Sequence, residues 1–308
     1  TAGYEVFSDP AEALAYIREQ GTYPAVVKAD GLALGKGVVI AQNEEEAKDA
    51  LHSIMEDKIF GESGSQVVVE EFLTGPEVSV LAFTDGKTLC PMVSSMDHKR
   101  AYDGNKGPNT GGMGTISPNP FYTEEVAKEC MEKIFLPTMH AMNAEGRPFK
   151  GCLYFGLMLT AQGPKVIEYN SRFGDPETQV VLPRLETDFA EIVKAVAEER
   201  LSEIEIRWSP KASACVVMAS GGYPGSYPKG IEIHGLDEMG QASGVTVYHA
   251  GTKLEGGKFL TNGGRVLGVT ALGDTLEQAL DKAYAGVGKI SFEGAMYRKD
   301  IGRAYSLK

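Results

Sequence analysis

The chain has 308 residues, of which 43% are hydrophobic and 23% are charged. This length exceeds one compact core and indicates two or three domains of an ordinary globular protein. The net charge of −12 argues against a general nucleic-acid binder, which would carry a basic face, but a local cluster of Lys and Arg can still bind an anionic substrate.

Cysteine usage and the lack of long apolar runs indicate the compartment. No two cysteines form a CxxC pair, which predicts free thiols in a reducing compartment; they are Cys90, Cys130, Cys152 and Cys215. Neither a secretory leader nor an apolar run of about 18 residues is found. We therefore expect a cytoplasmic protein that binds no membrane, and the net charge indicates that it binds no nucleic acid. A monomeric state is a separate expectation.

The first stretch, residues 1–75, alternates helix and strand. Ser8-Asp9-Pro10 predicts a helix that begins at Pro10. A second helix begins at Glu44 behind the N-cap Asn43. Apolar runs predict strands at 24–28, 37–41 and 67–72.

The loop between the first two of these strands suits a phosphate. Glycines let backbone N–H groups approach an anion and permit positive φ, and lysines add charge. The residues are Lys28, Gly31, Gly35, Lys36 and Gly37. The spacing is not that of a Walker loop, because a strand-like run follows rather than a helix. The loop is either a hairpin flap over phosphates or a surface hairpin whose glycines serve only the turn.

The strand at 67–72 ends in a segment that could bind a nucleoside. Here the backbone from Glu71 to Leu73 can hydrogen-bond an adenine edge, and Glu77 can accept from ribose hydroxyls. A strand end with solvated glutamates explains the same residues.

The second stretch, residues 76–208, begins with strands at 78–84 and 88–93. A long polar loop over 94–120 is expected to be functional or disordered. A helix from the cap Thr123 to about Ala144, strands at 151–160 and 165–169, and a helix from Asp188 follow. In the loop, Asp97, Lys99 and Arg100 could orient a small zwitterion, whereas His98 is expected to be a hydrogen-bonded loop residue.

A second polar group follows the strand at 165–169. Alternation places Glu168 and Asn170 on one face. A carboxylate and a carboxamide are hard oxygen ligands suited to Mg²⁺ that also contacts phosphates. Arg172 continues the alternation and offers donors for a carboxylate or phosphoryl oxygen. The alternative is a solvated polar strand face.

The third stretch, residues 209–308, is mainly strands. They are expected at 212–219, 231–234, 245–250, 258–261 and 265–271. One helix begins near Asp274, with Glu277 completing a capping box. The segment Asn262-Gly263-Gly264-Arg265 is either an anion site or a hairpin turn.

Together these motifs resemble glycinamide ribonucleotide synthetases, the phosphoribosylamine–glycine ligases of the ATP-grasp family. The resemblance covers nearly the whole chain. It is carried by the glycine-rich hairpin, the Glu-Glu-Phe-Leu exit, Asp97-His98-Lys99-Arg100, the segment from Gly107 to Gly114 and the segment from Glu168 to Glu177.

The resemblance implies an α+β chain: an ATP-grasp fold of two lobes, residues 1–75 and 76–208, followed by a mainly β carboxy-terminal domain, residues 209–308. It implies ATP, Mg²⁺ or Mn²⁺, glycine and 5-phosphoribosylamine as ligands, and ligation through glycyl phosphate. By role, the implied residues are Arg172 and Lys36 for catalysis; Lys28, Gly31, Gly35, Lys36, Gly37, Glu70, Glu71, Phe72, Leu73 and Glu77 for ATP; Asp97, Lys99, Arg172, Asp175 and Glu177 for substrate; and Glu168 and Asn170 for the metal.

Members of that family also carry an amino-terminal domain of about a hundred residues that this sequence does not show. We expect a shortened form that keeps the nucleotide site and has impaired ligation. Two rival functions are another ATP-grasp carboxylate–amine ligase and a non-catalytic ATP-binding module.

Overall fold

The computed structural model describes residues 1–31, 33 and 37–303. The chain forms two compact units: unit 1 is Thr1–Gly75 with Met158–Ile167, and unit 2 is Pro76–Leu157 with Glu168–Lys308. The predicted loop residues Gly35 and Lys36 lie outside the described residues. Within these residues, no helix combines the length and apolar character needed to cross a membrane.

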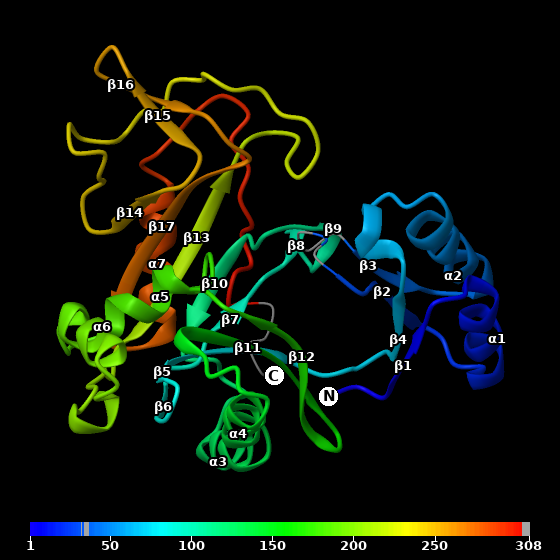
Figure 1. Ribbon diagram of the computed structural model, residues 1–308. Helices are drawn as coiled ribbons and strands as arrows, with labels where there is room; N and C mark the ends of the chain where they lie inside the picture. The colour runs from blue at the N-terminus through cyan, green and yellow to red at the C-terminus, as the bar shows by residue number, and fades with distance from the viewer. Residues whose placement is uncertain (32, 34–36, 304–308) are drawn as a thin grey trace. The chain divides into compact units, whose positions relative to one another are not determined.

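Unit 1 is an antiparallel four-stranded sheet, in the order β1-β4-β2-β3, with both helices on one face (Figure 1). The Asp9 carboxylate accepts from Ala11 N–H and so begins α1, and Asn43 caps α2. The apolar faces of both helices pack on Val67 and Val69 of the sheet. The elements are β1 (Tyr4–Phe7), α1 (Pro10–Gln20), β2 (Ala25–Ala29), β3 (Val38–Ala41), α2 (Glu44–Leu51) and β4 (Val67–Glu71), with a π-turn at His52–Glu56 and a 3₁₀ turn at Gly61–Gly64.

Unit 2 contains two larger sheets and two hairpins. One sheet has the order β12-β11-β5-β6, the other β14-β17-β13-β10-β7, and β8-β9 and β15-β16 are two-stranded. The strands are β5 (Glu77–Asp85), β6 (Leu89–Pro91), β7 (Met96–Asp97), β8 (Arg100–Tyr102), β9 (Lys106–Asn109), β10 (Gly114–Ser117), β11 (Lys150–Thr160), β12 (Gly163–Asn170), β13 (Ala212–Ala219), β14 (Thr246–His249), β15 (Thr252–Glu255), β16 (Lys258–Thr261) and β17 (Arg265–Gly273).

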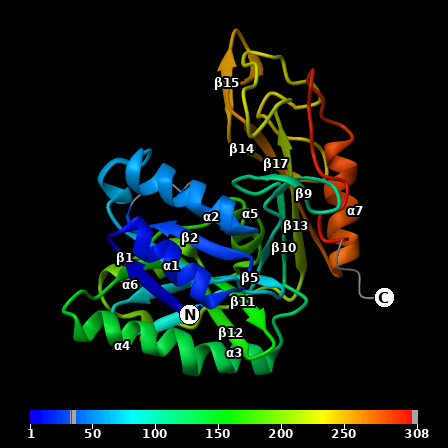
Figure 2. The same cartoon turned by 90° about the vertical axis from the view of Figure 1, so that its right-hand side faces the viewer.

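The helices of unit 2 cover these sheets. Helix α7 packs along β13 and β17 and closes the largest apolar cluster, as Figure 2 shows from the side. The helices are α3 (Glu124–Cys130), α4 (Leu136–Ala144), α5 (Thr178–Val181), α6 (Phe189–Ala197) and α7 (Leu276–Val287), with a π segment at Met131–Phe135 and 3₁₀ turns at Leu182–Arg184 and Leu201–Glu203.

Several sequence-based predictions of elements are wrong in detail. The segment 94–120 is not one loop, because it contains four short strands, and β10 is fully buried between β13 and β7. Residues 231–234 form only isolated bridges, since positive φ at Gly230 and Gly235 bends the chain on both sides. The edge strand β1 was not predicted, and the capping partner of α7 is Gln278 rather than Glu277.

Candidate functional site

In unit 1 the candidate residue Lys28 lies on the sheet face opposite the helices. Its ammonium is 2.7 Å from Glu70 Oε2, and both side chains are about four-fifths buried. Lys28 also donates to the carbonyl of Ile167 at 3.4 Å. The lysine therefore stands at the start of the glycine-rich loop with its position held by a carboxylate on the neighbouring strand.

The described glycines of that loop are required by space. Gly31 is not among the glycines with positive φ. Instead, a Cβ at Gly31 would lie 2.7 Å from Ser63 Cβ, and one at Gly37 would lie 2.5 Å from Ala33 Cβ. At these two positions glycine is needed because it allows close packing of the chain.

The strand exit after β4 is partly occupied by its own contacts. Glu71 N–H donates to the carbonyl of Gly3 at 2.9 Å, and the Glu71 carboxylate accepts from Gly3 N–H and Lys165. Of the predicted adenine-binding segment, only Phe72 and Leu73 make no such hydrogen bonds to other described residues.

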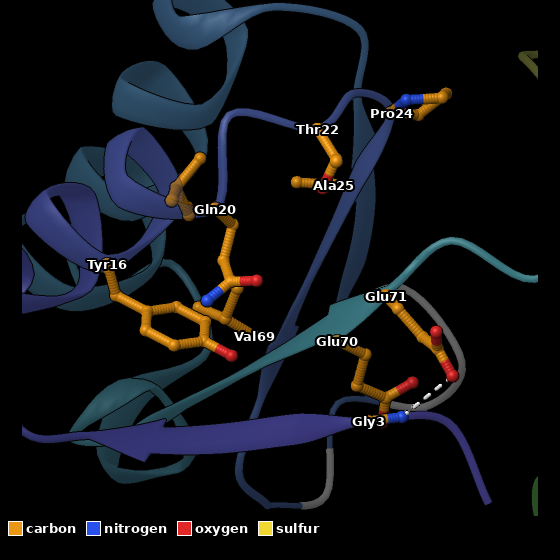
Figure 3. Close-up of a pocket in the computed structure, with 10 residues that line it drawn as sticks. Gly3, Tyr16, Gln20, Thr22, Pro24, Ala25, Val69, Glu70 and Glu71 are labelled. Atoms are coloured by element: carbon orange, nitrogen blue, oxygen red, sulfur yellow. Dashed lines mark hydrogen bonds between the residues drawn. The ribbon is translucent and has the colours of Figure 1, made fainter.

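Unit 1 also has a cavity on the helix side of the sheet (Figure 3), with a volume of about 160 Å³. Tyr16 and Gln20 of α1 line it together with Val69 and the Glu71–Gly3 contact. Lys28 is not among its lining residues, so this cavity is separate from the predicted phosphate site.

In unit 2 the predicted substrate residues form one charged group. Lys99 Nζ lies 3.2 Å from Glu77 Oε2. Burial alone would lower the pKa of Lys99, but the surrounding carboxylates, Glu77 foremost, raise it above its ordinary value. Burial raises the pKa of Asp97 well above its ordinary value, and the charge of Glu177 adds to this. The group thus combines a persistent cation with a carboxyl that can hold a proton.

Glu177 is buried at the base of this group, with only 4% of its surface exposed. Its Oε1 accepts from Tyr154 OH at 3.0 Å and from Ser79 Oγ at 3.3 Å. A Cβ at Gly112, whose φ is +113°, would lie 2.5 Å from Asp97 Oδ1. Only glycine lets the 107–114 segment approach Asp97 so closely.

Glu168 and Asn170 lie on the same face of β12, as alternation predicts. A Cβ at Gly156 would be 2.9 Å from Glu168 Cγ, so the adjacent strand leaves room for that side chain. Neither side chain is hydrogen-bonded to another described residue. Two unengaged hard oxygen donors fit a divalent cation whose remaining ligands are phosphate and water oxygens. Across residues 1–31, 33 and 37–303, no group of three or more His, Cys, Asp or Glu is arranged to hold a metal alone.

Arg172 and Asp175 follow on the same segment. Arg172 is exposed, and its only described hydrogen bond goes to the carbonyl of Phe173 at 2.9 Å. Asp175 is held by Arg265, whose guanidinium donates to the carboxylate at 3.0 Å and to the carbonyl of Gly111 at 2.7 Å. The alternative in which Arg265 is an open anion site is therefore wrong, since it bridges two parts of the site.

Sequence patterns did not reveal three residues of this site: Ser79, Tyr154 and Arg265 in its bridging role. Ser79 and Tyr154 sit within apolar strands, and their hydroxyls meet Glu177 only through the pairing of β5 with β11. The one available signal was a hydroxyl within an otherwise apolar run.

Comparisons with known proteins show which family the chain resembles. Residues 1–178 match the family "Phosphoribosylglycinamide synthetase, ATP-grasp (A) domain", and residues 213–304 match its C domain. A phosphoribosylamine–glycine ligase of Caldanaerobacter subterraneus is 50% identical over 99% of this chain and 72% of its own length. The trifunctional purine biosynthetic protein adenosine-3 of Gallus gallus is 52% identical over 98% of this chain and 30% of its own length.

Solved structures give the same picture. The phosphoribosylamine–glycine ligase of Thermotoga maritima is 36% identical with a TM-score of 0.86, covering 98% of this chain and 74% of that one. The biotin carboxylase domain of Hydrogenobacter thermophilus 2-oxoglutarate carboxylase, solved with MgADP and bicarbonate, covers 96% of this chain and 64% of its own at 15% identity and a TM-score of 0.71. The second likeness shows the fold alone.

Proposed function

The chain belongs to the phosphoribosylglycinamide synthetase family of ATP-grasp ligases, and on this premise we propose that it joins glycine to 5-phosphoribosylamine. The products are glycinamide ribonucleotide, ADP and phosphate, in purine biosynthesis. The family resemblance and the ATP-grasp fold inferred from the motifs are confirmed. ATP-grasp ligases use ATP and a divalent metal.

The observation that carries the proposal is the charged group of unit 2. Lys99 can pair with a carboxylate, while Asp97 and the buried Glu177 can receive an amine. A cation beside three acids, of which Glu77 pairs with Lys99, suits a zwitterion such as glycine. Exposed Arg172, on the segment after Glu168, is suited to a phosphoryl oxygen.

The reaction needs two displacements. A glycine carboxylate oxygen bonds to the γ-phosphorus as the bond to ADP breaks, which gives glycyl phosphate. The amine nitrogen of 5-phosphoribosylamine then bonds to the carbonyl carbon, loses a proton, and phosphate leaves. Glu168 and Asn170 would hold Mg²⁺ or Mn²⁺, which neutralises phosphate charge. The chain's task is positioning and charge neutralisation, so no covalent nucleophile is needed.

The nucleotide contacts remain part of the proposal. Lys28 and the loop glycines, with Gly35 and the catalytic candidate Lys36, would cover the phosphates. Phe72 and Leu73 would meet the adenine beside Glu70 and Glu71, and Glu77 the ribose. The division at residues 75 and 208, the monomeric state and the cytoplasmic location are proposed with them.

The decisive experiment measures ADP formation with ATP, Mg²⁺, glycine and 5-phosphoribosylamine, omitting each in turn. We expect ADP only when all are present. Replacing glycine by alanine or bicarbonate tests the rival ligase, and ADP formation with either of these instead of glycine would overturn the proposal. Nucleotide binding with no ADP formation under any combination would favour the non-catalytic module.

A further inference from the structure

His98 lies between Asp97 and Lys99 in the sequence but faces away from them. Asp97 and Lys99 face the charged group that contains Glu77, whereas the His98 side chain is only 2% exposed. Side chains alternate along an extended segment. Whatever holds His98 therefore sets the direction of its two neighbours.

His98 is held by the last described segment of the chain. Gly302 N–H donates to His98 Nε2 at 3.0 Å, so this nitrogen is the acceptor. The proton is therefore on Nδ1, which lies 3.1 Å from the carbonyl of Gly114. The imidazole thus joins the segment near residue 302 to both ends of the 97–114 segment.

Arg298 makes a second connection a few residues earlier. Among the described residues it is the largest fully buried side chain, and its guanidinium donates to both Asp300 oxygens at 2.8 and 2.9 Å. The third nitrogen donates to the carbonyl of Arg100 at 3.1 Å and to Asn105 Oδ1 at 3.0 Å. Burying a charged arginine is costly unless its donors are fully used.

The backbone completes this connection. Asp300 Oδ2 accepts from Gly104 N–H at 2.8 Å, and Lys299 N–H donates to Asp103 Oδ1 at 2.7 Å. The whole β8–β9 hairpin is thereby tied to residues 298–302. An apolar contact would stabilise the fold as well, but it would not fix the rotation of the hairpin so closely.

We propose that His98 and Arg298 are positioning residues that orient Asp97 and Lys99 toward the amino-acid and amine substrates. The proposal rests on the function proposed above. It assigns the end of the third stretch a role in substrate selection and leaves ATP binding to other residues.

The test is steady-state kinetics of His98→Ala and of a matched pair at the exposed Asp103. For His98→Ala we expect the KM for glycine to rise and kcat to fall by about tenfold or more, with the KM for ATP unchanged. Asp103→Ala should show a smaller change of the same kind. Asp103→Asn should restore wild-type values, because its carboxamide oxygen still accepts from Lys299 N–H.

Asp281→Ala is the control variant, since it removes the exposed Arg303–Asp281 pair near the same end of the chain and leaves the hairpin untouched. If His98→Ala does not fold, the Asp103 pair decides. Equal changes in the KM values for ATP and glycine, or an unchanged KM for glycine in Asp103→Ala, would overturn the positioning role. A wild-type protein without glycine-dependent ADP formation would instead refute the proposed function, and the positioning role with it.

Discussion

The two units hold their candidate residues in different ways. In unit 1, Lys28 pairs with one carboxylate, that of Glu70, and the loop after it consists largely of small residues. In unit 2, Asp97 and Lys99 are half-buried beside Glu177, which is buried and accepts hydrogen bonds from two hydroxyls. Substitutions in unit 1 should therefore separate activity from stability, whereas most of those in unit 2 should change both.

Glu168 should be the exception in unit 2, and it gives the largest expected effect. It is exposed and has no hydrogen-bonded partner among the described residues, so Glu168→Ala should reduce ligation by about 10²- to 10³-fold without changing the thermal midpoint. Glu168→Gln keeps one oxygen and should retain part of the activity. Unchanged turnover in Glu168→Ala would contradict the metal assignment. A lowered thermal midpoint would show that Glu168 also contributes to stability, as other residues of unit 2 do.

His98, unlike Glu168, is buried, so its protonation should change the free energy of unfolding. Burial first, and then the charge of Arg298, lower its pKa to about 4. In the unfolded state the His98 imidazole has a pKa near 6.5, so between pH 6.5 and 4 it binds a proton there but not in the folded state. Stability should therefore be fully present above pH 6.5 and fall by on the order of 3 kcal/mol as the pH drops through this window to 4.

The measurement is urea unfolding of the wild type and His98→Gln at pH 7 and pH 4.5. Carboxylates titrate in both proteins, so the difference between the two pH dependences isolates His98. We expect the variant to lose less stability on acidification. Identical losses would mean that His98 accepts a proton in the folded state.

Elements with contiguous local patterns could be predicted from the sequence, whereas strands that depend on distant pairing could not. Local patterns predicted β2, β4, β13 and the start of α1 within one or two residues, because their apolar periods and caps are contiguous in the chain. They also placed Glu168 and Asn170 on one face. They failed for the short strands β7 and β10, which lie in a stretch that resembles a loop and are held as strands by the pairing of β10 with both β13 and β7.

The partners of the site were beyond local patterns for a physical reason. Glu177 meets Ser79 across 98 residues of sequence, and Gly302 meets His98 across 204. Such contacts arise from sheet pairing and chain return, and no spacing rule encodes them. The chemistry of single residues was predictable, but their constraint by distant residues was not.

Asp85 offers a smaller test of buried bracing in unit 2, away from the substrate group. Its carboxylate accepts from Lys87 and Thr88 N–H in the β5–β6 turn and from Leu201 N–H at 3.0 Å. Asp85→Ala should lower the free energy of unfolding by about 2 kcal/mol, because a buried N–H loses its partner. Urea unfolding at pH 7 measures this.

The pH dependence gives the control for Asp85. Burial would raise its pKa, but the three backbone N–H donors outweigh burial and lower it. Its stabilisation should therefore be present above pH 4 and be lost as the pH falls through the folded-state pKa. Asp85→Asn should recover only part of the loss at pH 7, since its NH₂ would face one of the donors. Full recovery would contradict the assignment.

Lys28 gives the smallest of these effects and returns the comparison to unit 1. If it serves ATP phosphates, Lys28→Met should raise the KM for ATP by about tenfold through loss of a charged hydrogen bond. The KM for glycine and the thermal midpoint should stay the same. The matched control is Arg18→Met, which removes the exposed pair between α1 and α2 at 2.6 Å and should alter neither constant, since such pairs contribute little. A lowered thermal midpoint in Lys28→Met with an unchanged KM for ATP would show that the Lys28–Glu70 pair stabilises the fold and does not bind ATP. The two units would then not differ in the way stated above.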